Sequence, residues 1–125
     1  MKKLTIGIIL LLASFAASAG FITTLLLNAS TTGAGTGVNY SSFTSQIPIY
    51  QKYFMATLSG ASAVSATVEI DASTDNVNWS PLTTLSLTAA SSVVSTQQVI
   101  SAPYIRGNIT AISGVGATVT LRSGI

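Results

Sequence analysis

Short runs of β-forming residues fill this chain from Phe21 onward, and Gly, Asn, Asp, Ser or Pro interrupts them about every eight to twelve residues. Residues 66–72 show the pattern most clearly, because apolar side chains take every second position and polar ones take the others. No stretch after Tyr40 has a helical period. The pattern predicts an all-β fold, as an antiparallel β-sandwich or jelly-roll-like single domain.

The turn signals place the strands. We expect strands at residues 21–27, 53–58, 66–72, 82–87, 93–100, 104–109 and 117–122. Asp75 and Asn76 tolerate positive φ, so we expect a two-residue turn that folds the 66–72 strand back onto residues 77–82. Residues 114–116 should close a last hairpin into the C-terminal strand.

The N-terminus has the three-part layout of a secretory signal. Met1-Lys2-Lys3 is followed by an uncharged run at residues 4–17 and a small-x-small pattern at residues 17–19. Residues 21–27 prolong the apolar stretch to about 24 residues, within the roughly 17 to 25 that a spanning helix needs. Two alternatives stay open: residues 1–19 are a cleaved signal peptide, or they persist as a hydrophobic helix that anchors the chain.

A length of 125 residues suits one folded domain after this segment. We divide the chain into a signal peptide or retained membrane anchor at 1–19, a strand plus a Gly/Thr-rich loop at 20–40, and the remainder of the sandwich at 41–125. The glycines of the loop do not form a phosphate-binding motif, because no Lys follows them and no helix begins there.

The residue types present argue against several classes of chemistry. The chain has no Cys and no His, which zinc sites and nucleophilic triads require, and only 6% of its residues are charged. After residue 19 the chain has three cations, Lys52, Arg106 and Arg122, and three anions, Glu69, Asp71 and Asp75. So few cations cannot neutralise a row of phosphates, and so few carboxylates supply no acid and base pair. We therefore expect no enzyme, no cofactor, no metal site and no nucleic-acid partner.

Hydroxyl groups take the place of charges. The chain has 18 Ser and 17 Thr. A surface of this kind has little electrostatic repulsion, and it packs easily against copies of itself. We expect a homo-oligomer.

Two residues of the 104–109 strand are candidates for an interaction patch. Tyr104 and Arg106 point to one strand face, where a guanidinium could stack on an aromatic ring. The alternative is that Arg106 pairs with Glu69 or Asp71 on the next strand and serves no ligand.

A second candidate patch lies in the most aromatic segment, residues 47–55. We interpret it as an edge strand that docks on a partner through Pro48, Tyr50 and Lys52, with Pro48 and Lys52 discouraging uncontrolled pairing. The alternative is that its aromatic residues belong to the core.

The turn around Asp75 and Asn76 carries the only Trp. Trp79 should plug one end of the core, and the alternative is an exposed ring that stacks on a sugar. Asp71, Asp75, Asn76 and Asn78 supply oxygens of the kind that calcium takes, but the fit is poor because no bidentate Glu follows. We interpret Trp79, Asp75 and Asn76 as structural residues.

Four stretches together resemble a known group of proteins. They are residues 25–29 with the Gly/Thr stretch after them, 68–79, 103–114 and 116–121. The group consists of small β-sandwich proteins encoded among bacteriophage structural genes. The resemblance spans most of residues 21–125, and it implies a virion role such as decoration, minor capsid or fibre. The N-terminal segment departs from this group, because capsid parts assembled in the cytoplasm need no export signal.

These observations favour a non-enzymatic structural protein of a phage virion, a decoration, minor capsid or membrane-anchored capsid-associated protein. Its partners would be other virion or surface-lattice proteins, with membrane contact through residues 4–27. Two alternatives stay open: a secreted bacterial surface or carbohydrate-binding module, and an exported filament subunit in which residues 21–40 become a strand donated to a neighbour.

Overall fold

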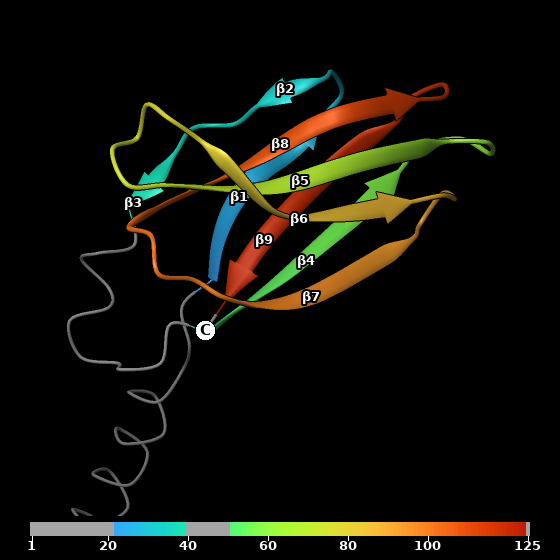
Figure 1. Cartoon of the computed structure of the whole chain (residues 1–125). Helices are drawn as coiled ribbons and strands as arrows, with labels where there is room; N and C mark the ends of the chain where they lie inside the picture. Colours follow the sequence, from blue (N-terminus) through green and yellow to red (C-terminus); the bar gives the residue numbers. More distant parts are fainter. Residues whose placement is uncertain (1–21, 40–50, 125) are drawn as a thin grey trace, which may run out of the picture.

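The computed structural model describes residues 22–39 and 51–124, and within these ranges every regular element is a β-strand (Figure 1). The strands are β1 (Ile22–Ala29), β2 (Gly33–Ala34), β3 (Val38–Asn39), β4 (Gln51–Ser59), β5 (Ser65–Ser73), β6 (Ser80–Leu87), β7 (Val93–Val99), β8 (Tyr104–Ser113) and β9 (Thr118–Gly124). Each long strand predicted from the sequence corresponds to one of them, which confirms the all-β prediction.

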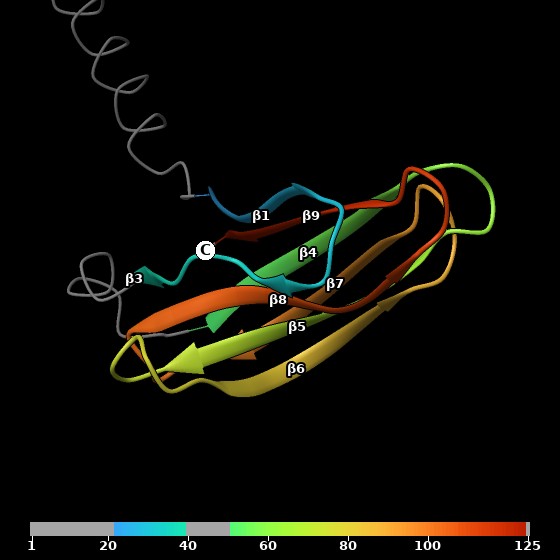
Figure 2. The ribbon, with the colours of Figure 1, turned by 90° about the horizontal axis from the view of Figure 1, so that it is seen from above.

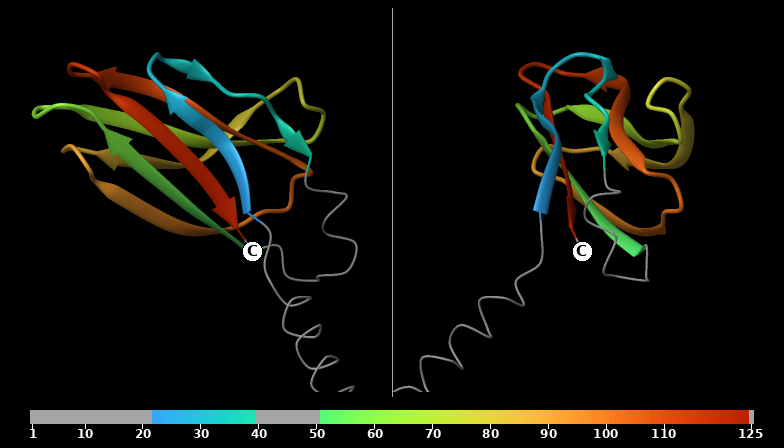
Figure 3. Two further views of the ribbon diagram at one scale, coloured as in Figure 1. Left: turned by 180° about the vertical axis from the view of Figure 1, so that it is seen from behind. Right: turned by 90° about the vertical axis from the view of Figure 1, so that its left-hand side faces the viewer.

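The strands form two antiparallel sheets that pack face to face (Figure 2). The first sheet has the order β1-β9-β4-β7, which Figure 3 shows from behind. The second sheet has the order β2-β8-β5-β6, and β3 also pairs with β8. The short β2 and β3 thus lie along the same edge of β8.

The core lies between the sheets because each long strand turns alternate side chains inward. In β4 these are Phe54, Ala56 and Leu58, and in β8 they include Ile105 and Ile109. The largest fully buried side chains come from both sheets and from the loop after β4: Phe54, Leu58, Val64, Val68, Ile70, Leu87, Ile105, Ile109, Val119 and Leu121. Among the described residues, Phe54 and many aliphatic side chains therefore form a continuous core.

Gly107 lets the two sheets approach closely at the middle of β8. Its position faces the core, where an added Cβ would lie 2.8 Å from the side chains of both Leu26 and Leu121. Leu26 comes from β1 and Leu121 from its neighbour β9. The missing side chain thus makes room for two leucines of the opposite sheet.

Most connections cross from one sheet to the other. Among the described strands, only β5 and β6 are consecutive in the chain and adjacent in a sheet. The predicted hairpin at residues 114–116 is therefore wrong, because β8 belongs to the second sheet and β9 to the first. Gly114 sits in this connection with φ +101, and a Cβ there would lie 2.7 Å from Val64 Cγ1. Glycine at this position allows a tight connection between the two sheets, and this connection packs against the loop after β4.

The turn between β5 and β6 is longer than predicted. β5 ends at Ser73 and β6 begins at Ser80, so residues 74–79 form a loop in place of a two-residue turn. Asn76 has the expected positive φ, 61°. Residues 77–79 thus precede the return strand, and Trp79 belongs to the loop.

The N-terminal hydrophobic helix predicted at residues 1–19 lies outside the described residues. No helix long and apolar enough to cross a membrane occurs in the part of the chain that the structure describes.

Candidate functional site

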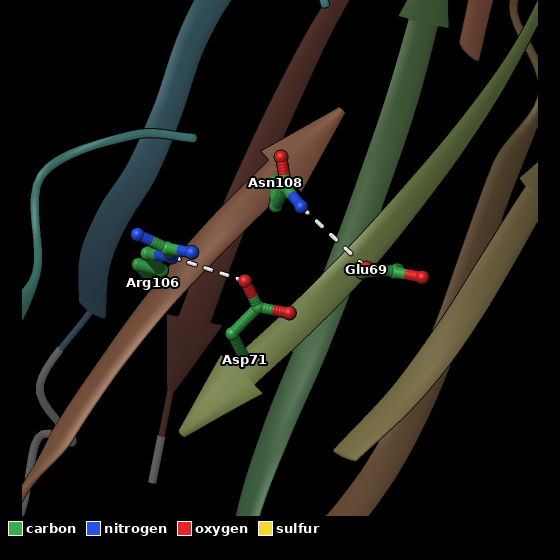
Figure 4. Close-up of polar contacts among 4 residues, drawn as sticks. All are labelled: Glu69, Asp71, Arg106 and Asn108. Carbon is green, nitrogen blue, oxygen red and sulfur yellow. Dashed lines mark hydrogen bonds and ion pairs between the residues drawn. The ribbon is translucent and has the colours of Figure 1, made fainter. Parts of the chain in front are cut away.

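A ladder of polar side chains crosses from β5 to β8 on the outer face of the second sheet (Figure 4). Asp71 lies directly opposite Arg106, and Glu69 lies opposite Asn108. Arg106 Nε donates to Asp71 Oδ2 at 3.0 Å, and Asn108 Nδ2 donates to Glu69 Oε2 at 3.5 Å. The cross-strand pairing considered for Arg106 from the sequence is thus what the geometry shows, with Asp71 as the partner.

The Asp71–Arg106 ion pair is largely removed from solvent. Asp71 is 3% exposed, and the Arg106 side chain is 24% exposed. The second carboxylate oxygen, Asp71 Oδ1, is buried and has no hydrogen-bond partner within the described ranges. Arg106 is therefore the cation on which this buried carboxylate depends, and removing it would leave a costly unpaired charge.

The ring of Trp79 stacks on the guanidinium of Arg106. The guanidinium carbon of Arg106 lies 4.4 Å from the centroid of the Trp79 ring, within the range of a cation–π contact. Trp79 is half-buried and is not part of the core cluster. The prediction that Trp79 plugs one end of the core is therefore wrong, because the loop 74–79 carries the ring over the outer face of the sheet. We call Asp71, Arg106 and Trp79 the Arg106 stack.

The segment between β2 and β3 runs against the edge of the Trp79 ring. A Cβ at Gly37 would lie 2.8 Å from both Cζ2 and Cη2 of Trp79, and closer still to Asn76 Oδ1. Immediately after Gly37, β3 pairs with the start of β8, with Val38 opposite Ile105. The Arg106 stack thus joins β5, β8, the loop before β6 and the segment before β3.

Asp75 holds the loop that presents Trp79. Its Oδ1 accepts the backbone N–H groups of Asn78 at 2.8 Å and Val77 at 2.9 Å, and its Oδ2 accepts the Asn78 side-chain amide at 2.7 Å. These bonds, the backbone N–H of Asn78 foremost, hold the pKa of the Asp75 carboxyl well below its usual value. Asp75 therefore acts on the fold of its own loop, as Asn76 does through its positive φ.

The structure describes three of the five residues of the two predicted patches: Tyr104, Arg106 and Lys52. Tyr104 and Arg106 share the outer face of β8, but Arg106 is engaged in the stack. Pro48 and Tyr50 lie outside the described residues. Lys52 is 4% exposed on the core side of β4, and burial lowers the pKa of its amine.

The interpretation of residues 47–55 as an edge strand is corrected by the position of β4. This strand lies between β9 and β7 in the middle of the first sheet. Lys52 lies two residues before the fully buried Phe54, so both side chains point to the core face of β4. Lys52 therefore cannot belong to an outer docking surface. The side chain of Tyr53 points to the outer face of β4, and Tyr53 is 43% exposed.

An apolar hollow lies on the outer face of the first sheet, and the sequence analysis missed it. Its volume is about 380 Å³. The lining comes from β1, β4 and β9: Ile22, Tyr53, Met55, Arg122, Ser123 and Gly124. The alternation of Tyr53 and Met55 on one strand was the available signal, but only the pairing of β4 with β9 brings Arg122 beside them.

The chemistry of the described site is that of packing and orientation. Asp71 is bound to Arg106, and Asp75 is bound to its own loop. No group of three or more His, Cys, Asp or Glu that could hold a metal ion occurs among the described residues. The Arg106 stack fixes the loop 74–79 on the second sheet, while the hollow, with Arg122 in its lining, lies on the outer face of the first sheet.

Comparisons with known proteins give one distant structural likeness. No model of a known protein family matches the chain, and a search of curated proteins finds no significant match. Among solved structures, the chain resembles one described as the PBSX exported protein XepA, with 15% sequence identity and a TM-score of 0.52. The match covers 86% of this chain and 37% of that chain, so this chain spans little more than a third of the length of its structural neighbour. At this identity the likeness shows a shared two-sheet fold.

Proposed function

We propose that this protein is a non-enzymatic structural component of a bacteriophage virion, of the decoration, minor capsid or membrane-anchored type. The observation that carries the proposal is where the charges lie. Arg106 and Asp71 neutralise each other beneath Trp79, Lys52 is buried, and Asp75 is bound within its own loop. Glu69 on β5 and Arg122 on β9 remain as charged groups of the outer faces, which otherwise carry mostly hydroxyl and apolar side chains and suit packing against neighbours.

Two further points support this role. The sequence resembles small sandwich proteins of bacteriophage structural genes over most of residues 21–125. The structural neighbour is named as an exported protein, which accords with the signal-like layout of residues 1–19. A particle that contains a membrane or assembles at the host envelope would accommodate both the resemblance and the apolar N-terminus.

The test is the intact mass of the native protein in gradient-purified particles, compared with that in the culture fluid. We expect the protein to sediment with particles at constant stoichiometry across the gradient. Residues 22–27 of the apolar stretch belong to β1, so the expected membrane contact through residues 4–27 cannot include them. A mass that starts at Met1 would assign the apolar residues before β1 to an anchor, and one that starts at Gly20 would assign residues 1–19 to a cleaved signal. Finding the protein only free in the culture fluid would refute the virion role.

A secreted carbohydrate-binding module is the second candidate, favoured by the exported neighbour and by the exposed Tyr53 beside the hollow. It predicts that sugars bind with an affinity that Tyr53→Ala abolishes and that the control Thr84→Ala, on β6, leaves unchanged. Because Arg106 occupies one side of Trp79, quenching of Trp79 fluorescence is not the expected signal. Calorimetric titrations that stay flat across a broad glycan panel would eliminate this candidate.

The donated-strand filament receives no support from the fold. β1 pairs with β9 of its own chain and completes the first sheet. Residues 22–29 are therefore already used within the sandwich.

A further inference from the structure

Three of the four sheet edges carry features that hinder pairing with another strand. β1 shifts register twice against β9, and Asn28 within it has φ 47. β6 contains Pro81, and the register of its pairing with β5 shifts between Ile70 and Asp71. The outer edge of β8 is taken by β2 and β3. Bulges, proline and covering segments are the usual devices that protect an edge.

The β7 edge of the first sheet has no bulge and no proline, and none of the strands at residues 22–39 and 51–124 covers it. β7 pairs with β4 over seven consecutive residues, from Val93 opposite Thr57 to Val99 opposite Gln51, without any shift of register. Its sequence, VVSTQQV, contains no charged residue, no Pro and no Gly. Figure 3 (left) shows β7 along the lower margin of the sheet, and no described strand lies beyond it. A regular, uncharged edge of this length is a template for another strand.

The hydrogen bonds next to β7 show which of its backbone groups face outward. Leu58 N donates to Ser92 O, and Leu58 O accepts from Ser91 N, so the backbone of Leu58 points toward the β7 side. The backbone groups of Ala56, Phe54 and Lys52 point the same way. They pair with Val94, Thr96 and Gln98 of β7. The backbone groups of Val93, Ser95 and Val99 consequently point away from β4.

We propose that β7 pairs antiparallel with β7 of a second copy of this chain, so that the two first sheets join into one continuous sheet. The absence of charge in β7 means that self-pairing brings no like charges together. A twofold axis lets both copies use the same edge, which closes the contact at a dimer. As a contact within a particle this inference rests on the proposed function, but the pairing itself rests on the geometry of the edge.

The side chains beside the edge fit the same partner. Val93 is 58% exposed and Val99 is 74% exposed, and both lie on the outer face that carries Tyr53 and Met55. Pairing of two copies would place these exposed valines next to those of the partner, and so would bury apolar surface that one copy leaves in water. A charged partner strand would gain no complementary group from β7.

The test uses the natural absence of cysteine. The full chain is produced from Met1 with one cysteine at a time at each position of β7, from Val93 to Val99, and mild oxidation is applied in the expressing cells before extraction. Paired residues of two strands turn their side chains to the same face, so the twofold axis must lie midway between one residue of β7 and the same residue of the second copy. The Cα separation there is about 4.5–5.5 Å, which a disulfide can bridge.

We expect one β7 position to give a dominant covalent dimer on a non-reducing gel, at least about tenfold above the control Ser86→Cys on β6. A yield at every β7 position no higher than that control would overturn the inference. Stronger cross-linking of Thr24→Cys on β1 would also overturn it, because the other edge would then be the contact.

A charge variant tests the same contact without oxidation. Ser95→Lys adds one cation to the β7 edge of each copy, whereas Ser86→Lys adds the same charge to β6. Sedimentation of the full chain in mild detergent should show dimers for the wild type and Ser86→Lys, and monomers for Ser95→Lys. A monomeric wild type at all concentrations would contradict the inference.

The two proposals fail separately. Particles that contain the protein but give no β7 cross-link would remove the β7 pairing and keep the virion role. A β7 dimer of a protein that never enters particles would do the reverse.

Discussion

The guanidinium of Arg106 is covered by Trp79, whose ring centre lies 4.4 Å from the guanidinium carbon. Arg106 Nε also donates to the buried carboxylate of Asp71 at 3.0 Å. One side chain thus fixes a loop to two strands. Because the ring is the only Trp in the chain, tryptophan fluorescence reports the surroundings of Trp79 alone.

Arg106→Ala should lower the free energy of unfolding by about 2–3 kcal/mol, because it leaves the Asp71 carboxylate buried without its cation. Arg106→Lys should cost about 1–2 kcal/mol, because a lysine keeps the charge but loses the planar group that stacks on Trp79. Urea unfolding followed by circular dichroism measures both. Arg122→Ala, on the exposed face of β9, is the matched control and should change stability by less than about 0.5 kcal/mol. Equal losses for Arg106→Ala and Arg122→Ala would contradict the role of the stack.

Gly37→Ala should displace the Trp79 ring, since the added Cβ would lie 2.8 Å from two of its carbon atoms. We expect a red shift of tryptophan emission and a loss of about 1–3 kcal/mol in stability, the usual range for overpacking. The neighbouring, exposed Thr36→Ala serves as the control and should leave the emission spectrum unchanged. An unaltered spectrum in Gly37→Ala would show that the segment before β3 does not support the ring.

Asp75 should make stability depend on pH in the acid range. Its folded pKa lies below the usual value of 3.8, so the stabilisation is fully present above that pH and is lost as the pH falls through the folded pKa. The melting temperature of the wild type should therefore exceed that of Asp75→Asn at neutral pH, and the difference should shrink as the pH falls below about 4.

The same pH series on Asn78→Ala supplies the control for Asp75. This variant removes the side-chain donor and keeps the backbone donors of Asn78 and Val77. It should retain most of the acid-dependent loss of stability. A difference between wild type and Asp75→Asn that stays constant across the series would refute the explanation.

Gly107→Ala should destabilise the sandwich by about 1–3 kcal/mol, because its Cβ meets Leu26 and Leu121 in a filled core. Leu26→Ala alone should cost about 2–4 kcal/mol through the cavity that it leaves. The double variant should lose less than the sum of the two, since the smaller residue makes room for the added methyl group. Additive losses in chemical unfolding would show that the two positions do not share the space.

The local pattern predicted the strands well and their partners poorly. The alternation of apolar and polar residues along 66–72 is a local property of the sequence, and it correctly predicts the strand β5. The glycines at 114 and 116 do mark a change of direction. Whether the next strand returns to the same sheet or crosses to the other depends on contacts with Val64 and the rest of the core, which no local signal encodes.

In the candidate site, too, the sequence predicts local features, and the tertiary structure decides which residues meet. Tyr104 and Arg106 were placed on one strand face by their spacing, and a carboxylate of the next strand was named as an alternative partner for Arg106. The contact with Trp79 was missed, because it requires the loop 74–79 to fold over the outer face of the second sheet. The prediction that Lys52 lies on the surface is wrong. The alternation of residues along β4 shows which side chains share a face, but not which face meets the core.

The sequence by itself determined an all-β chain with known strand positions, a turn built on Asp75 and Asn76, and surfaces almost without charge. These properties follow from a two-residue period, from φ preferences and from composition, all of which act locally. The tertiary structure decided which strands are central and which are edges, that Lys52 points inward, and that β7 is the regular uncharged margin. Those outcomes depend on pairing between segments far apart in the chain, where the packing of the whole core selects the partner.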